Sequence, residues 1–167
     1  NFLLESVETS PVQDANITRL TGTQPQSKLG RNIDVILTSQ LLTNILPHLK
    51  QNQQLKKRVE DALNKCIQKI QRGQDNDGSF KDGGWAPVLQ SALANNALES
   101  AKDAGMKVSD STLTRSREYQ QKNYDIKTNS AVTGKAAGVM LYSLSSTARA
   151  SAKEAKQAVD KIEKAKK

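Results

Sequence analysis

The sequence predicts an all-α fold of about six helices, paired into antiparallel helical hairpins. Apolar residues recur at three- and four-residue spacings between about residues 32 and 124, which is the period of amphipathic helices. No stretch alternates β-branched or aromatic residues with polar ones between two turn signals, as a strand would. Hydrophobic residues make up 36% of the chain and aromatic residues only 4%, so the predicted core consists of aliphatic side chains and many alanines, which suits closely packed helices.

The first 31 residues differ in composition from the rest of the chain. They are rich in Thr, Ser, Gln, Asn and Pro, and their one apolar cluster, between Phe2 and Val7, has no helical continuation. We therefore expect an extended N-terminal arm over 1–31, which wraps over a neighbour or is loosely held. The helical-repeat domain is expected over 32–167.

The first helical hairpin is predicted to follow this arm. One helix begins near Asn32 and should end or kink at Pro47, because proline interrupts the helical hydrogen bonds. The clearest helix of the chain follows, with apolar residues at helical spacing from Leu55 to Ile70. Gly73 lies just past it, where glycine can adopt the left-handed conformation that often ends a helix.

A second hairpin is predicted farther along the chain. One helix runs from Trp85 to Ala104, with Pro87 in its first turn and Gly105 just past its end. Ser109 or the residue after it can cap the next helix, which runs to about residue 124. Because the link between the two helices is short, they should be antiparallel neighbours.

The remaining segment is predicted to contain a turn over 123–129 and two further helices. Gly134 and Gly138 lie four residues apart in the first of these, over about 131–144, and indicate close helix contact. The last stretch spaces its apolar residues by alternating fours and threes, as in a short coiled-coil seam. These residues are Ala148, Ala152, Ala155, Val159 and Ile162.

Positive charge is concentrated near the C-terminus. The chain has a net charge of +8, and half of it lies between Arg149 and Lys167, where seven basic residues accompany three acidic ones. A solvated lysine-rich helix explains this, and so does a surface for an acidic partner or an anionic membrane. Nucleic acid is a less suitable partner, because the few aromatic residues are not interleaved with the basic ones. No run of eighteen apolar residues, which a transmembrane helix would need, occurs in the sequence.

The most informative motif lies between the two hairpins. Gln74 is followed by two residues, by Asp77-Gly78-Ser79 and by Phe80, and Gly83-Gly84-Trp85 comes shortly afterwards. Asp-Gly makes a tight turn, Phe80 can fill the space between helix ends, and the amide of Gln74 can bond free backbone groups at a helix terminus. We interpret Gln74, Asp77, Gly78, Phe80 and Trp85 as structural residues.

This motif resembles the Gln/Trp repeat of the squalene cyclase and protein prenyltransferase superfamily, with Phe80 at the position where that repeat usually has tryptophan. The stretch over about 62–124 is most similar to bacterial repeat-containing proteins of the superfamily. The resemblance implies part of an α/α toroid, in which about a dozen helices surround a central cavity. Six helices cannot complete such a ring, so another protein chain or the missing remainder of the fold should cover the apolar inner face.

The chemistry of that superfamily is not matched by the residues present. Its class II terpene cyclases use an Asp-x-Asp-Asp motif as a general acid, and the nearest match, Asp75-Asn76-Asp77-Gly78, has glycine at the fourth position. Its prenyltransferases hold zinc through Asp, Cys and His ligands, whereas this chain has only Cys66 and His48 of the last two types. We therefore expect no cofactor and no catalytic residue.

A calcium turn is the one metal site that the sequence leaves open. Asp75, Asp77 and Asp82 cluster around Gly78, but the spacing does not fit an EF-hand, because glycine occupies its first and twelfth ligand positions. A nucleophile pair of Cys66 and His48 is also weighed, and is disfavoured because Cys66 lies on an apolar stripe.

The leading functional hypothesis is a non-catalytic helical-repeat scaffold or interaction subunit of a larger assembly. An alternative is an incomplete half of a terpenoid-cyclase-like enzyme whose catalytic residues lie outside this chain, and a third is a free-standing basic binding module. The resemblance also implies an extracytoplasmic location in a bacterium.

Overall fold

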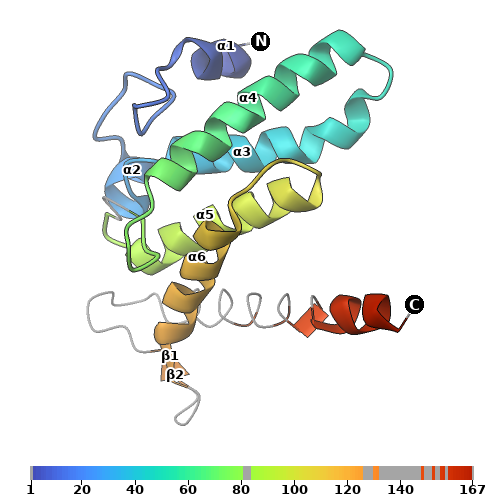
Figure 1. Ribbon diagram of the computed structural model, residues 1–167. Coiled ribbons are helices and arrows are strands. Elements are labelled where there is room, and N and C mark those ends of the chain that lie inside the picture. Colours follow the sequence, from blue (N-terminus) through green and yellow to red (C-terminus); the bar gives the residue numbers. More distant parts are fainter. Residues whose placement is uncertain are drawn as a thin grey trace.

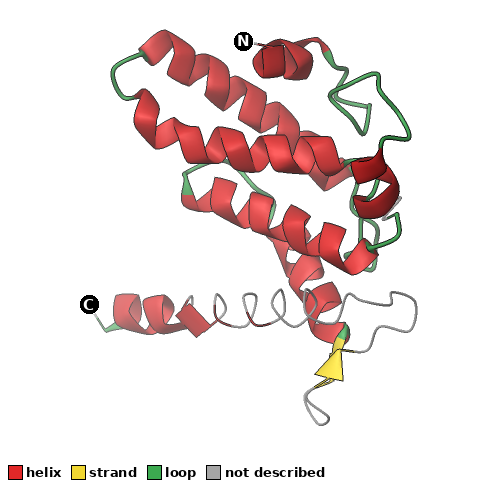
Figure 2. Ribbon diagram, turned by 180° about the vertical axis from the view of Figure 1, so that it is seen from behind, coloured by secondary structure: helices red, strands yellow, loops and turns green. Residues whose placement is uncertain are grey.

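The computed structural model describes residues 2–80, 84–125, 130–131, 148, 152, 155–156 and 158–166. It is all-α, as the sequence predicts, and the helices dominate Figure 2. In chain order the elements are α1 (Phe2–Thr9), α2 (Gln24–Leu29), α3 (Ile33–Ile45), the 3-10 helix η1 (Leu46–Leu49), α4 (Gln53–Arg72), α5 (Pro87–Asp103), α6 (Asp110–Lys122), and the two-residue strands β1 (Tyr124–Asp125) and β2 (Ser130–Ala131). Residues 158–165 are also helical.

The helices form a row, and their order in this row differs from their order in the sequence. Helix α3 is central and packs against both α4 and α5, while α1 packs on the far side of α4 and α6 on α5. Figure 1 shows α1 and α6 at opposite ends of this row. Strands β1 and β2 pair in antiparallel fashion beyond α6.

One hydrophobic core runs through the row. Its fully buried members include Ile33 and Ile36 of α3, Leu63 and Ile67 of α4, and Leu98 of α5. Burying a large aliphatic side chain contributes about 1.5–3 kcal/mol to the free energy of unfolding. On α4, every lysine and glutamine except the buried Lys69 is exposed or half-buried, so the amphipathic pattern in the sequence places this part of the core correctly.

Several helix ends match the sequence-based prediction. Helix α3 gives way to η1 just before Pro47, and Pro87 opens α5. Gly105 follows α5 with a φ of 88°, and the hydroxyl of Ser109 accepts a hydrogen bond from the backbone N–H of Thr112. The predicted hairpin of α5 and α6 is therefore present.

The expectation of an extended N-terminal arm is corrected by the structure. Phe2–Thr9 is helical, and its Leu4 and Val7 are buried in the main core. A short helix, α2, also forms within the arm, with a capping box between Thr23 and Gln26. An isolated helix of eight residues is unstable in water. The apolar cluster is helical here because it packs against the hydrophobic surface of α4.

Helix α4 also holds this N-terminal region through polar contacts. The guanidinium of Arg58 donates to both carboxylate oxygens of Glu8, at 2.5 and 2.8 Å. The ammonium of Lys69, a residue only 3% exposed, donates to the backbone carbonyls of Pro11, Asp14 (2.9 Å) and Asn16 (3.1 Å). Residues 2–16 are thus anchored to the helical body.

The predicted left-handed cap at Gly73 is wrong. Gly73 has a φ of −77°, and its N–H bonds the carbonyls of Lys69 and Ile70, so the last turn of α4 simply tightens. The predicted helix over 131–144, with Gly134 and Gly138, lies almost wholly outside the described residues. All five residues of the predicted seam are among the described residues, and all five are exposed, Val159 and Ile162 by more than half. None of the described helices combines the length and the apolar character needed to cross a bilayer.

Candidate functional site

The segment from Gln74 to Phe80 forms a closed corner between α4 and α5. Gln74 and Phe80 face each other in an antiparallel bridge, and the N–H of Asp75 donates to the carbonyl of Ser79 at 2.8 Å. Gly78 reverses the chain with a φ of 89°, a conformation that side chains other than glycine rarely adopt. The segment is therefore a compact turn.

Gln74 fastens this corner to the next hairpin. Its Nε2 donates to the backbone carbonyl of Thr112 at 3.0 Å, and its Oε1 accepts from Nη2 and Nε of Arg115, at 2.9 and 3.2 Å. Thr112 lies in the first turn of α6, so the amide of Gln74 binds α6. Both ends of one amide are thus satisfied by α6.

The two aromatic residues of the motif behave differently. Phe80 is 3% exposed and belongs to the main core, whereas the Trp85 side chain is 61% exposed. At Trp85 the backbone makes the contact: its N–H donates to the carbonyl of Ser27, and that of Ala86 to the carbonyl of Lys28, at 3.2 and 2.8 Å. Phe80 therefore contributes to the core through its ring, whereas Trp85 contributes to the corner through its backbone.

The acidic residues of the corner take part in the turn itself. Oδ1 of Asp77 accepts from the hydroxyl and the N–H of Ser79, at 2.6 and 3.0 Å, and the hydrogen bond from the hydroxyl lowers the pKa of this carboxyl. Asp82, the third residue of the calcium candidate, lies outside the described residues. Across the described residues no three His, Cys, Asp or Glu side chains gather into a group that could hold a metal ion.

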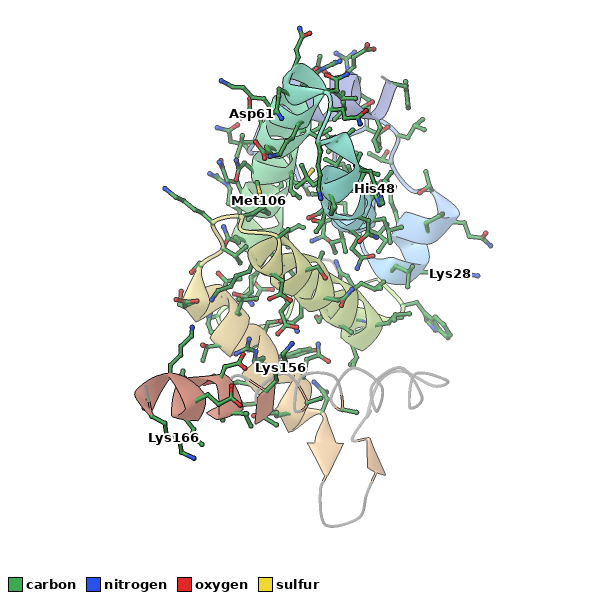
Figure 3. All side chains as sticks on the ribbon, turned by 90° about the vertical axis from the view of Figure 1, so that its right-hand side faces the viewer. Lys28, His48, Asp61, Met106, Lys156 and Lys166 are labelled. Atoms are coloured by element: carbon green, nitrogen blue, oxygen red, sulfur yellow. The ribbon has the colours of Figure 1, made fainter. Side chains whose placement is uncertain are left out.

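Cys66 and His48 do not form a nucleophile pair. Cys66 is fully buried on α4, and burial raises the pKa of its thiol to about 12, so the reactive thiolate is scarce at neutral pH. His48 is exposed on η1, where Figure 3 shows it. The thiol is therefore a packing group.

An apolar ridge lies along the contact between α3 and α5. We define it as Leu37, Leu41 and Leu93. Leu37 and Leu41, one turn apart on α3, are 45% and 49% exposed. Gln40 lies between them and donates to the backbone carbonyl of Leu93, which places α5 beside them.

A pocket of about 450 Å³ lies between the α5–α6 hairpin and residues 160–164. Two of its cationic lining residues are paired with carboxylates. Lys102 pairs with Asp110, and Nε of Arg117 donates to Oε1 of Glu99 at 3.1 Å. This pocket therefore presents no cluster of unpaired charges of one sign on the hairpin side.

Comparison of the chain with known protein families, with curated proteins and with solved structures finds no match. The resemblance to the squalene cyclase and prenyltransferase repeat therefore stays a prediction from the motif.

Proposed function

We propose that this chain is a non-catalytic helical scaffold or interaction subunit of a larger assembly, in which the apolar ridge is covered by further helices of the same repeat type. These helices come from another protein chain or from the remainder of the fold. The observation that carries the proposal is the exposure of Leu37 and Leu41 on the central helix of the row. Two leucines one turn apart form an adjoining apolar surface, which a neighbouring helix can bury.

The geometry of the corner supports the same proposal. In an α/α repeat, each hairpin must be fixed to the next one so that the array extends regularly. The amide of Gln74 does this here by binding Thr112 and Arg115 of the following hairpin. Gln74 therefore joins the corner to the α5–α6 hairpin.

The proposal is tested by the association of the isolated chain. Sedimentation velocity over a range of concentrations should show that the isolated chain self-associates. A hydrophobic dye should bind to the apolar surface of chains that remain monomeric. The double variant Leu37→Lys, Leu41→Lys should abolish dye binding and association while far-ultraviolet circular dichroism stays unchanged. Leu20→Lys is the matched control, because Leu20 is 68% exposed but lies in the loop before α2.

A monomer at every concentration, with no dye binding, would contradict the proposal. So would a loss of association in the Leu20 variant equal to that in the double variant. The alternative is that the chain is half of a terpenoid-cyclase-like enzyme. Sequencing the gene on either side of the segment that encodes these residues distinguishes the two hypotheses. An adjoining Asp-x-Asp-Asp run with further Asp-Gly-Ser-aromatic repeats would favour the enzyme.

A further inference from the structure

A small pocket lies where three segments that are distant in the sequence meet. It has a volume of about 230 Å³ and is formed by the loop after α1, by the two residues before α3, and by the end of α4. We propose that this cationic pocket, defined by Arg31, Asn32, Lys69, Arg72 and Gly73, binds a small oxyanion, namely a phosphate or carboxylate group.

Two arginines at the pocket supply positive charge and directional donors. Arg31 and Arg72 both line it, and both side chains are exposed. Among the described residues neither guanidinium has a carboxylate partner or a hydrogen bond. A guanidinium presents parallel N–H groups that match two oxygens of a phosphate or carboxylate. The two arginines are therefore available to such a group.

A buried amide supplies a further donor. Asn32 is only 5% exposed, and its Oδ1 accepts a hydrogen bond from Nε2 of Gln90. This bond fixes which end of the Asn32 amide faces the core, so that Nδ2 points toward Gly73, which also lines the pocket. No described residue accepts a hydrogen bond from this Nδ2. A donor in this position is typical of a site that binds an acceptor.

Gly73 keeps that donor accessible. Its φ of −77° suits any residue, so the backbone does not require glycine here. A Cβ at this position would lie 3.2 Å from Nδ2 of Asn32. The missing side chain thus leaves Nδ2 facing the pocket.

The rest of the lining agrees with a small anion. The ammonium of Lys69 is already bonded to three carbonyls, so it contributes charge and fixes the loop that forms the opposite wall. Asp14 also lines the pocket and opposes an anion, which leaves three cationic groups against one carboxylate. The volume is below the range of about 300–1,000 Å³ that drug-sized ligands occupy. A single charged group is therefore the expected ligand.

The proposal is tested by calorimetric titration of the full chain at constant ionic strength. Three probes distinguish the source of the oxyanion: inorganic phosphate, phenyl phosphate and acetate. Saturable binding of at least one is expected. Either Arg31→Gln or Arg72→Gln should weaken it about tenfold, the effect of losing one charged hydrogen-bonding partner. Gly73→Ala should also weaken it, because the added methyl group crowds Asn32.

The matched control is Lys28→Gln, since Lys28 carries the same charge on neighbouring α2 and points away from the body of the protein in Figure 3. It should leave the affinity unchanged. Circular dichroism checks that each variant is folded, and if one arginine variant unfolds, the other carries the test. The absence of saturable binding for all three probes up to about 10 mM, or equal weakening by Lys28→Gln, would overturn the proposal.

Discussion

Gly78 lies directly against the backbone carbonyl of Arg115, so that a Cβ at Gly78 would overlap the carbonyl oxygen. The corner between the hairpins and helix α6 are therefore in contact through main chain as well as through the amide of Gln74. Gly78 is required for two separate reasons. Its φ is +89°, and it has no space for a side chain.

Gly78→Ala should accordingly destabilise the protein more than a positive φ alone explains. Forcing alanine into the left-handed region costs about 1–2 kcal/mol, and overpacking against α6 adds about 1–3 kcal/mol. Gly105→Ala is the matched control, because Gly105 has a φ of +88° and nothing within 4 Å of its Cβ position. Urea unfolding measures both. Equal losses in the two variants would show that the corner does not press on α6.

The Asp77 carboxylate predicts a dependence on pH. Its pKa is lowered from 3.8 by the hydrogen bonds of Ser79, so the folded state binds this proton more weakly than the unfolded state does. The carboxylate therefore stabilises the fold above about pH 4, and this contribution is lost as the pH falls through the lowered pKa. It amounts to at most about 1 kcal/mol, because the exposed carboxylate is screened by water.

Asp77→Asn should therefore be less stable than the wild type near pH 7 and no less stable near pH 2. Urea unfolding at the two pH values measures the difference. Asp61→Asn is the control for the loss of one negative charge, since Asp61 is exposed on α4 (Figure 3). A stability gap for Asp77→Asn that stays constant over this range would refute the role of the carboxylate.

The sequence predicts the hairpins well because their signals are local. The stripe from Leu55 to Ile70, Pro87 at the start of α5 and Ser109 before α6 each act within a few residues of the chain. The N-terminal arm was predicted incorrectly because its structure depends on a tertiary contact: Phe2–Thr9 is helical because α4 covers it. The exposure of Trp85 was not predicted, since only the structure shows that its backbone N–H, rather than its ring, contacts α2.

The cationic pocket could not be predicted for the same reason. Arg31 and Arg72 are ordinary surface residues in the sequence, and only folding brings the end of α4 beside the start of α3. One local sign existed. Asn32 precedes α3, as a capping residue would, but its side chain makes no cap and bonds Gln90 instead. That the Asn32 side chain bonds Gln90 instead of capping α3 can be seen only in the folded structure.

The contact between α5 and α6 contains a buried ion pair that sequence spacing does not reveal. Nε of Arg117 donates to Oε1 of Glu99 at 3.1 Å, and the two side chains are 13% and 2% exposed. Removing one partner of such a pair leaves an uncompensated buried charge. Arg117→Met should therefore lower the free energy of unfolding by about 3–5 kcal/mol.

Replacing both partners should restore most of this loss. In Glu99→Met, Arg117→Met no charge is left buried, and apolar side chains of similar size fill the space, so its stability should lie within about 1 kcal/mol of the wild type. Lys102→Met is the control, because it breaks the neighbouring pair with Asp110, whose side chains are 41% and 85% exposed, and it should change stability little. Urea unfolding of the wild type and the three variants measures these differences in stability. If the double variant is as unstable as Arg117→Met, the cost arises from lost packing of the arginine rather than from the stranded carboxylate.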